Sequence, residues 1–304
     1  MRRKVSKIGS STLMVSLPAK WVKANHINKG DEVEIIEEGS KLEIVSNKSR
    51  PNKDKIILDV NDFGTYTLRC LAAMYRKGYD EIEIRFTEPG IIKKIQEYVT
   101  YLIGFEIVKQ GKNFCIVRSI SDGLEMEFDS VLRRTFLLLL SMAEDSLGII
   151  KKGNIEALND IYYLEETNNK FTTFCRRLLI KNSHNNCKEV PSIYYVVEEL
   201  EKIADEYKYL CYYLTKRNDK SKISDETLKV YQEVNKLLRL FYESYYKFDI
   251  NKSLEISRKR KKIIKDIYTK FDDESKKEIR ILHHLINITQ MTANMSTVYL
   301  VAKI

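Results

Sequence analysis

The chain is poor in proline, glycine and histidine. Its 304 residues include 4 Pro and 11 Gly, which argues against long disordered linkers and against an all-β fold with many tight turns. None of the 4 histidines lies in a zinc-binding or catalytic-triad pattern. A glycine-rich phosphate loop and a nucleophile-elbow pattern are also missing from the sequence. We therefore expect a protein that is not an enzyme, with a metal-dependent enzyme as the least favoured alternative.

Patterned cysteines and long apolar segments are missing as well. The 5 cysteines are scattered without a C-x-x-C pair, which is typical of reduced thiols rather than of a disulfide framework. The apolar run Phe136–Leu140 is far shorter than the ~18 residues that a membrane span needs. The N-terminal segment has basic residues but no apolar signal core. We expect a cytoplasmic protein without membrane insertion.

Acidic residues are absent from the first part of the chain. The formal net charge is +9, and the first acid is Asp31. An acid-free basic segment indicates an anionic partner such as double-stranded DNA, although a solvated N-terminal arm is the alternative. The basic residues before Asp31 that form this segment are Arg2, Arg3, Lys4, Lys7, Lys20 and Lys23.

The first region, residues 1–47, has the pattern of a small β-rich domain. Short strands are predicted over 5–9 and 13–17, joined by a turn at 9–11. Pro18 should end the second strand and begin a short helix over 19–24. Period-two alternation predicts two further strands, over 32–36 and 41–45.

This region is too small to bury its own strands. We therefore expect a homodimer in which two copies share one core. Trp21, the only tryptophan, should pack into that core. Its packing would direct the neighbouring Lys20 and Lys23 outward.

The second region, residues 53–120, alternates strands and helices. The pattern predicts a small two-layer α/β domain of the order β-α-β-α-β-β. The strands are expected over 55–60, 81–86, 106–108 and 114–117, and the helices over 66–77 and 90–103.

The third region, residues 125–304, has helical periodicity throughout. We expect six helices, and their spacing suggests two successive groups of three packed as an antiparallel bundle. The breaks between helices are expected at 153–154, 182–191, 218–224, 249–251 and 272–275. The chain is thus predicted to be a multidomain α+β protein.

Two charged clusters in this region invite a functional hypothesis. Glu198, Glu201 and Asp205 would line one stripe of a helix, where like charges oppose each other by a few tenths of a kcal/mol. A bound Mg, Mn or Fe ion would relieve that repulsion, although a solvated acidic face is favoured on the pattern alone. The basic run 258–262 could bind nucleic acid, but an exposed helix segment is the preferred interpretation.

Residues 3–45 resemble the AbrB/MazE/SpoVT swapped-hairpin DNA-binding domain. The resemblance is carried by V-x-K-x-G-x-S from Val5, by V-S-L-P-x-x-W up to Trp21 and by K-G-D-x-V-x-I from Lys29. It implies a dimeric β-barrel of interlaced hairpins that grips DNA with basic side chains of its first half. The candidate DNA contacts are Arg2, Arg3, Lys4, Lys7, Ser10, Ser11, Lys20 and Lys23.

The third region resembles PhoU, the phosphate-uptake regulator, whose two three-helix halves each carry an E-x-x-x-D motif. Glu201–Asp205 fits the motif of the first half, whereas the second-half counterpart at 286–290 has no acid. The resemblance implies a divalent or ferric metal ion held by Glu198, Glu201 and Asp205.

An AbrB-like domain before a PhoU-like bundle resembles the PhoU-type regulators of archaea. That implies a DNA-binding transcriptional regulator of phosphate uptake. The alternative is a signalling adaptor that contacts a phosphate transporter or its sensor, with the N-terminal domain serving dimerisation.

Overall fold

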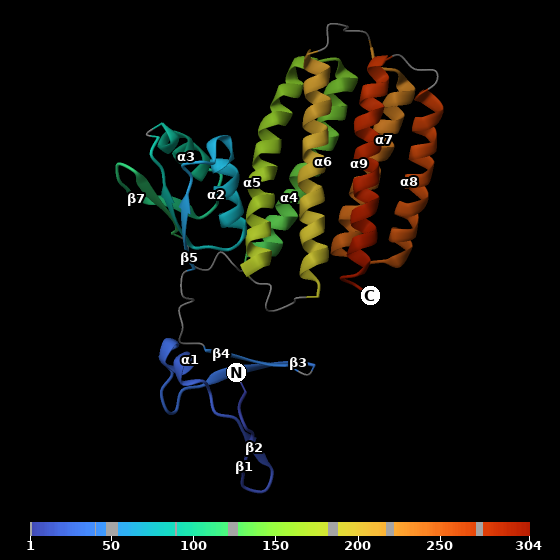
Figure 1. Ribbon diagram of the computed structural model, residues 1–304. Helices are drawn as coiled ribbons and strands as arrows, with labels where there is room; N and C mark the ends of the chain where they lie inside the picture. Colours follow the sequence, from blue (N-terminus) through green and yellow to red (C-terminus); the bar gives the residue numbers. More distant parts are fainter. Residues whose placement is uncertain are drawn as a thin grey trace. The chain divides into compact units, whose positions relative to one another are not determined.

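The chain contains two compact units. The computed structural model describes residues 2–39, 41–46, 54–88, 90–120, 127–181, 188–216, 222–271 and 276–304. Their contacts divide the chain into Met1–Asp54 and Lys55–Ile304 (Figure 1). The first unit is small and contains four strands and a short helix, and the second ends in a series of long helices. The expected multidomain α+β class is confirmed.

The first unit consists of two hairpins and a short helix. β1 (Ser6–Ile8) pairs antiparallel with β2 (Thr12–Met14), and Gly9 supplies the positive φ of 70° in the turn between them. β3 (Val33–Glu38) pairs antiparallel with β4 (Lys41–Ser46). The order of elements is as the sequence predicts.

The second strand is shorter than predicted. β2 ends at Met14, because its partner β1 has only three residues to pair with. Pro18 therefore does not end this strand. It precedes α1 (Ala19–Ala24) with φ −63° and ψ 124°, a geometry that leads directly into a first helical turn.

The strands of this unit expose large apolar side chains. Between 49% and 69% of each side chain is accessible at Val5, Ile8, Leu13, Met14, Val15, Ile35 and Leu42. Trp21 is half-buried, and no residue of α1 is fully buried. The closure of two copies into one barrel around Trp21 stays a prediction.

The second unit begins with a four-stranded sheet. Its elements are β5 (Lys55–Asp59), η1 (Gly64–Tyr66), α2 (Thr67–Arg76), β6 (Glu81–Arg85), α3 (Ile91–Val99), β7 (Phe105–Gln110) and β8 (Phe114–Ser119). The strand order is β5-β6-β8-β7, with β5 and β6 parallel and the other pairs antiparallel. The predicted β-α-β-α-β-β order is thus observed. α3 ends at Val99, four residues earlier than predicted, as the chain turns toward Gly104 at positive φ.

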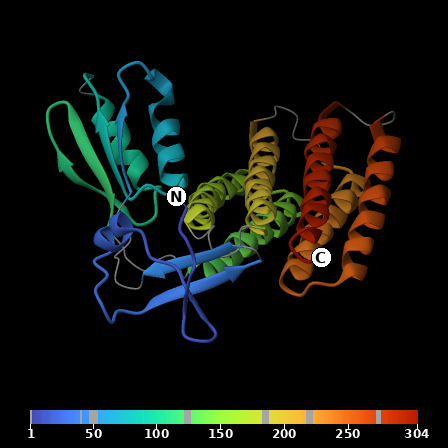
Figure 2. The ribbon, with the colours of Figure 1, turned by 60° about the horizontal axis from the view of Figure 1, so that its bottom comes forward.

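The sheet and the helices that follow it share a core. Phe174 and Leu178 of α5 are buried among side chains of α2, α3 and the sheet, including Leu71 and Ile84. In both ribbon views α2 lies between the sheet and α5 (Figures 1 and 2). Side chains from both sides of the boundary predicted near residue 125 therefore pack together. Whether a domain ends at this residue is not tested, and the boundary stays a prediction.

Six long helices make up the rest of the described chain. They are α4 (Phe128–Lys152), α5 (Asp160–Lys181), α6 (Val190–Lys216), α7 (Asp225–Tyr246), α8 (Ile250–Phe271) and α9 (Lys276–Leu300), with the 3-10 helix η3 (Ile155–Asn159) between α4 and α5. The helices end near the breaks that the sequence indicates, although residues 182–187, 218–221 and 272–275 of those breaks lie outside the described residues. Ser224 caps α7 by accepting a hydrogen bond from the Thr227 amide at 3.2 Å.

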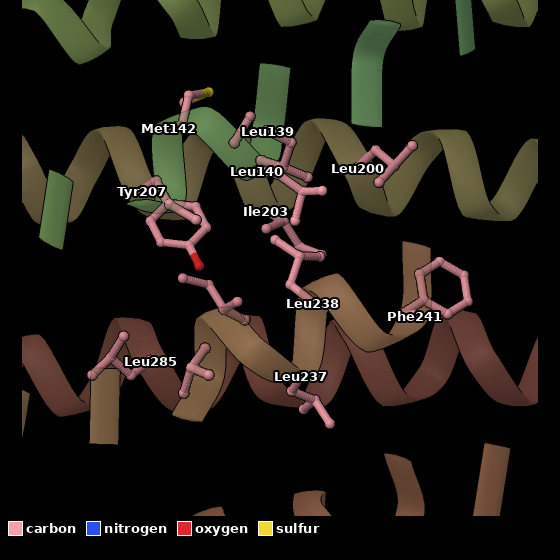
Figure 3. Close-up of a cluster of buried hydrophobic side chains, with 14 of the residues drawn as sticks. Leu139, Leu140, Met142, Leu200, Ile203, Tyr207, Leu237, Leu238, Phe241 and Leu285 are labelled. Carbon is pink, nitrogen blue, oxygen red and sulfur yellow. The ribbon is translucent and has the colours of Figure 1, made fainter. Parts of the chain in front are cut away.

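These helices contact one another in two sets. α4, α5 and α6 touch one another, as do α7, α8 and α9, and the sets meet through α6 with α9 and α4 with α7. Leucines and aromatic rings fill the space between them (Figure 3). Two polar side chains in this core are paired: the Tyr207 hydroxyl donates to Asn235 Oδ1 at 2.8 Å, and Asn235 donates to the Ala143 carbonyl at 2.5 Å. The contact sets agree with the predicted groups of three, and an internal repeat stays a prediction.

The described cysteines are free, as expected. Cys115, Cys175 and Cys211 are buried and Cys70 is half-buried. Burial raises the pKa of the Cys115 thiol to about 11 and that of the Cys211 thiol to about 12. Within the described stretches, none of the helices combines the length and apolarity that a membrane crossing requires.

Candidate nucleic-acid interface and acidic cluster

The predicted DNA contacts are all exposed. Lys7 lies in β1, Ser10 and Ser11 form the turn after it, and Lys20 and Lys23 lie on α1. Lys20 and Lys23 are three residues apart, so they share one face of the helix. No acidic partner is found among the described residues for the basic residues of this segment, which are Arg2, Arg3, Lys4, Lys7, Lys20 and Lys23. Their charges are thus available to an anion.

The short helix that carries two of these lysines is closed locally. The side chain of Asn25 donates a hydrogen bond through Nδ2 to the Trp21 carbonyl at 2.8 Å. The backbone N–H of Asn25 donates to the same oxygen at 3.0 Å. These two hydrogen bonds close the last turn of the helix that carries Lys20 and Lys23. Both lysines are exposed on α1, and their contact with DNA stays a prediction.

The acidic stripe on α6 faces an arginine. Arg176 of α5 has a side chain only 2% exposed. Its Nη1 donates to Glu198 Oε1 at 2.6 Å, and its Nη2 contacts Glu201 Oε2. Thr172 donates a further hydrogen bond to Glu201 at 2.7 Å. A cation of the protein itself thus neutralises the charge repulsion that suggested a metal.

The third carboxylate of the stripe is also paired. Lys208 Nζ lies 2.6 Å from Asp205 Oδ1 and 2.7 Å from Glu165 Oε1 on α5. Burial lowers the pKa of Lys208, but its bonds to Asp205 and Glu165 outweigh that effect and raise the pKa above its ordinary value. Lys208 is therefore charged at neutral pH and bridges the two helices.

The structure does not support the expected metal site. Glu198, Glu201 and Asp205 do lie on one stripe, but they contact Arg176 and Lys208. Within the part of the chain that the structure describes, no three or more His, Cys, Asp or Glu residues are grouped so as to hold a metal ion. A guanidinium already occupies the space between Glu198 and Glu201, so a cation there would have to displace it.

The partners of these acids are not among the residues that the sequence singles out. Arg176 and Arg177 follow Phe174 and Cys175 and precede two leucines. Arginines inside an apolar helical stretch rarely remain unpaired when buried. That signal predicts buried acidic partners, although it cannot tell which acids they are.

The basic run 258–262 lies on α8 as an amphipathic segment. Ile256 and Ile263 are buried, whereas Arg258, Lys261 and Lys262 are exposed and the two residues between them are half-buried. The preferred interpretation of this run, an exposed helix segment, agrees with the structure.

The N-terminal part of the chain matches a known protein family. Residues 7–55 match the family "Antidote-toxin recognition MazE, bacterial antitoxin". The match includes five of the candidate DNA contacts, which are Lys7, Ser10, Ser11, Lys20 and Lys23. The other candidates, Arg2, Arg3 and Lys4, precede it. No curated protein matches the chain.

The second unit resembles solved PhoU structures. PhoU from Pseudomonas aeruginosa aligns with a TM-score of 0.50 at 15% identity, over 59% of this chain and 97% of its own. The phosphate transport system regulatory protein PhoU from Streptococcus pneumoniae aligns with a TM-score of 0.47 at 16% identity, over 58% of this chain and 93% of its own. The chain thus joins a MazE/AbrB-type domain to a helical part similar in fold to PhoU, as the two resemblances imply.

Proposed function

We propose that the protein is a cytoplasmic, dimeric transcriptional regulator of phosphate uptake. The N-terminal unit binds double-stranded DNA, and the helical part senses a signal or a partner protein. The protein is not an enzyme under this proposal. The observation that carries it is the exposed, acid-free basic segment, of which Lys7, Lys20 and Lys23 fall within the match to the MazE family.

The chemistry of the basic segment supports DNA as its partner. Lysines and arginines on turns and on one helix face neutralise phosphates, and each phosphate neutralised lowers log K by about 0.9 for a tenfold rise in salt. The polar side chains of Ser10 and Ser11 lie at the β1–β2 turn, where they could reach backbone or base edges. Phosphate regulation is part of the proposal, and the fold of the helical part, which resembles that of P. aeruginosa PhoU, supports it.

Charge reversal tests the DNA contacts. We expect the full chain to bind duplex DNA with an affinity that falls steeply as salt rises, and Lys20→Glu with Lys23→Glu to abolish most of that binding. Fluorescence anisotropy with labelled duplex at several salt concentrations measures both effects. In a dimer the two substitutions remove two phosphate contacts per chain, four in all, and should reduce the salt slope by about 3.6.

A matched control uses the other basic cluster. Lys261→Glu with Lys262→Glu makes the same change in net charge on exposed residues of α8, and it should leave the affinity within about twofold of the wild type. Binding that is insensitive to salt, or that is lost only in the α8 variant, contradicts the proposed interface.

The alternative is a signalling adaptor that contacts a phosphate transporter or its sensor. The similarity in fold to PhoU favours it, and under this reading the N-terminal unit serves only for dimerisation. A pull-down with transporter subunits that still succeeds after removal of residues 1–50 would favour the adaptor over the DNA-binding regulator.

A further inference from the structure

A pocket of about 570 Å³ lies between the sheet domain and the helical part. One wall comes from α2 and from the end of α3, and the other from α5 and α6. Its volume is within the range of about 300–1,000 Å³ of small-molecule sites, which often lie between domains. The residues proposed below to contact a ligand are Arg69, Arg76, Tyr98, Tyr101, Tyr162, Asn169 and Lys170, all of which line it.

Two arginines face this pocket from α2. Arg69 and Arg76 are seven residues apart, so they lie two turns apart on one face of the helix. Arg69 packs against the ring of Tyr66 at 5.1 Å. Arg76 is half-buried, and no described residue offers it a hydrogen bond or an ion pair. In contrast, the buried Arg176 and Arg177 are both held by carboxylates.

An arginine without an anionic partner at the wall of a pocket is suited to bind one from solution. A guanidinium presents a planar fork of donors that matches carboxylate and phosphate oxygens. Lys170 adds a third positive group: its Nζ donates to the Thr100 carbonyl at 2.7 Å, which leaves two of its three N–H donors for a ligand. Three acids also line the pocket, but Glu165 is paired with Lys208 and Glu201 with Arg176, which leaves Glu166 on the α5 wall. The cations outnumber the remaining acid, so the α2 wall favours a phosphate-bearing ligand.

Tyrosine rings supply flat surfaces on both walls. Tyr98 and Tyr101 lie with ring centroids 6.3 Å apart, and Tyr162 stands on α5 across the pocket. Tyr101 is 41% exposed and Tyr162 is 51% exposed, so both rings have free faces. Base stacking on aromatic rings contributes about 1–3 kcal/mol per base in single-strand binding proteins.

Asn169 has a buried side-chain oxygen without a hydrogen-bond donor in the part of the chain that the structure describes. Its side-chain nitrogen donates to Glu165 Oε1 at 2.5 Å, which fixes the orientation of the amide. Its Oδ1 is buried and accepts no hydrogen bond from the described residues. A buried acceptor without a donor is unfavourable, and an N–H group of a bound molecule would satisfy it.

We propose that this pocket binds an adenine nucleotide. Arg76, with Arg69 and Lys170, holds the phosphate, the tyrosine rings hold the base, and Asn169 Oδ1 accepts from the exocyclic amino group. Because the pocket is built by both the sheet domain and α5, an occupant would bridge the two. This site is independent of the proposed DNA interface, since none of its residues belongs to the N-terminal unit.

Calorimetric titration of the full chain with AMP tests the site. We expect saturable binding of one AMP per chain, and a loss of at least tenfold in affinity for Arg76→Gln, since a hydrogen-bonded charge pair is removed. Lys94→Gln changes an exposed cation of the neighbouring α3 that does not line the pocket, and it should bind AMP as the wild type does.

Three further ligands separate the parts of the pocket. Inorganic phosphate and adenosine should each bind at least tenfold more weakly than AMP. N6,N6-dimethyl-AMP, which has no amino N–H, should also bind more weakly to the wild type but equally to Asn169→Ala.

The proposal is overturned by any of three results. They are no AMP binding at millimolar concentration by folded protein, inorganic phosphate binding as tightly as AMP, and full affinity in Arg76→Gln. DNA binding by the same preparation, measured without nucleotide, shows separately whether the proposed regulator function holds.

Discussion

Buried charges decide how the acidic stripe behaves at the scale of single residues. Glu198 and Glu201 are about one-third exposed, but the guanidinium between them is almost completely buried. Removing one partner of such a pair leaves a charge without compensation, which typically costs 3–5 kcal/mol. Arg176 is therefore expected to be the residue of this cluster on which stability depends most.

Arg176→Gln should lower the free energy of unfolding by about 3 kcal/mol. Urea denaturation followed by circular dichroism measures this change. Arg239→Gln is a suitable control, because Arg239 pairs with Glu144 at the surface, where the side chains are 46% and 56% exposed. That control should cost less than about 1 kcal/mol. Equal effects of the two variants would contradict the role assigned to Arg176.

At the scale of elements, α5 connects the sheet domain to the bundle. Arg177 on this helix donates to the carbonyls of Tyr75 and Tyr79 at 2.8 and 2.7 Å and to Asp80 Oδ1 at 2.6 Å. Lys181, one turn later, lies 2.7 Å from the same carboxylate oxygen. Asp80 thus holds two cations of α5 at the end of α2.

Asp80→Asn should loosen this contact. The amide has the shape of the carboxylate but no charge, so Arg177 and Lys181 lose their shared counterion, and we expect a destabilisation of about 3 kcal/mol. Hydrogen exchange should rise first in α2 and β6. Asp62→Asn, at an exposed position of the preceding loop, serves as the control and should change neither quantity. Unchanged exchange in α2 would show that α5 does not hold the sheet domain in this way.

The sequence predicts elements better than it predicts pairings. Helix periodicity and polar breaks locate α4 to α9, because each long helix must bury one stripe of apolar residues. The extent of β2 could not be predicted, since it depends on the three residues of β1 across the ladder. The acids of α6 were recognised as a cluster, but their partner Arg176 lies on a different helix. Local pattern alone does not tell which side chains of two helices meet.

At the scale of the whole molecule, we expect the N-terminal unit to need a second copy to complete its core. Its strands expose apolar side chains, and a domain of fewer than 60 residues has little core of its own. A second copy of the unit is the partner that the proposed function requires.

The full chain should therefore be a dimer whose association depends on these strands. Leu13→Glu with Leu42→Glu replaces side chains that are 69% and 65% exposed, and it should give a monomer because charge is placed in the shared core. Light scattering after size-exclusion chromatography measures the mass. Leu254→Glu on α8, at a side chain 50% exposed, should remain dimeric. A monomeric wild type, or a dimeric double variant, would contradict this expectation.

The most direct test of the regulator is a map of its binding sites in the cell. Chromatin immunoprecipitation of the full chain at high and low phosphate should find discrete sites near phosphate-uptake genes, with an occupancy that changes with phosphate. The same map with Lys20→Glu and Lys23→Glu should lose those sites at equal protein abundance. Sites that persist in the double variant, or the absence of any enrichment over background with the wild type, would contradict the account.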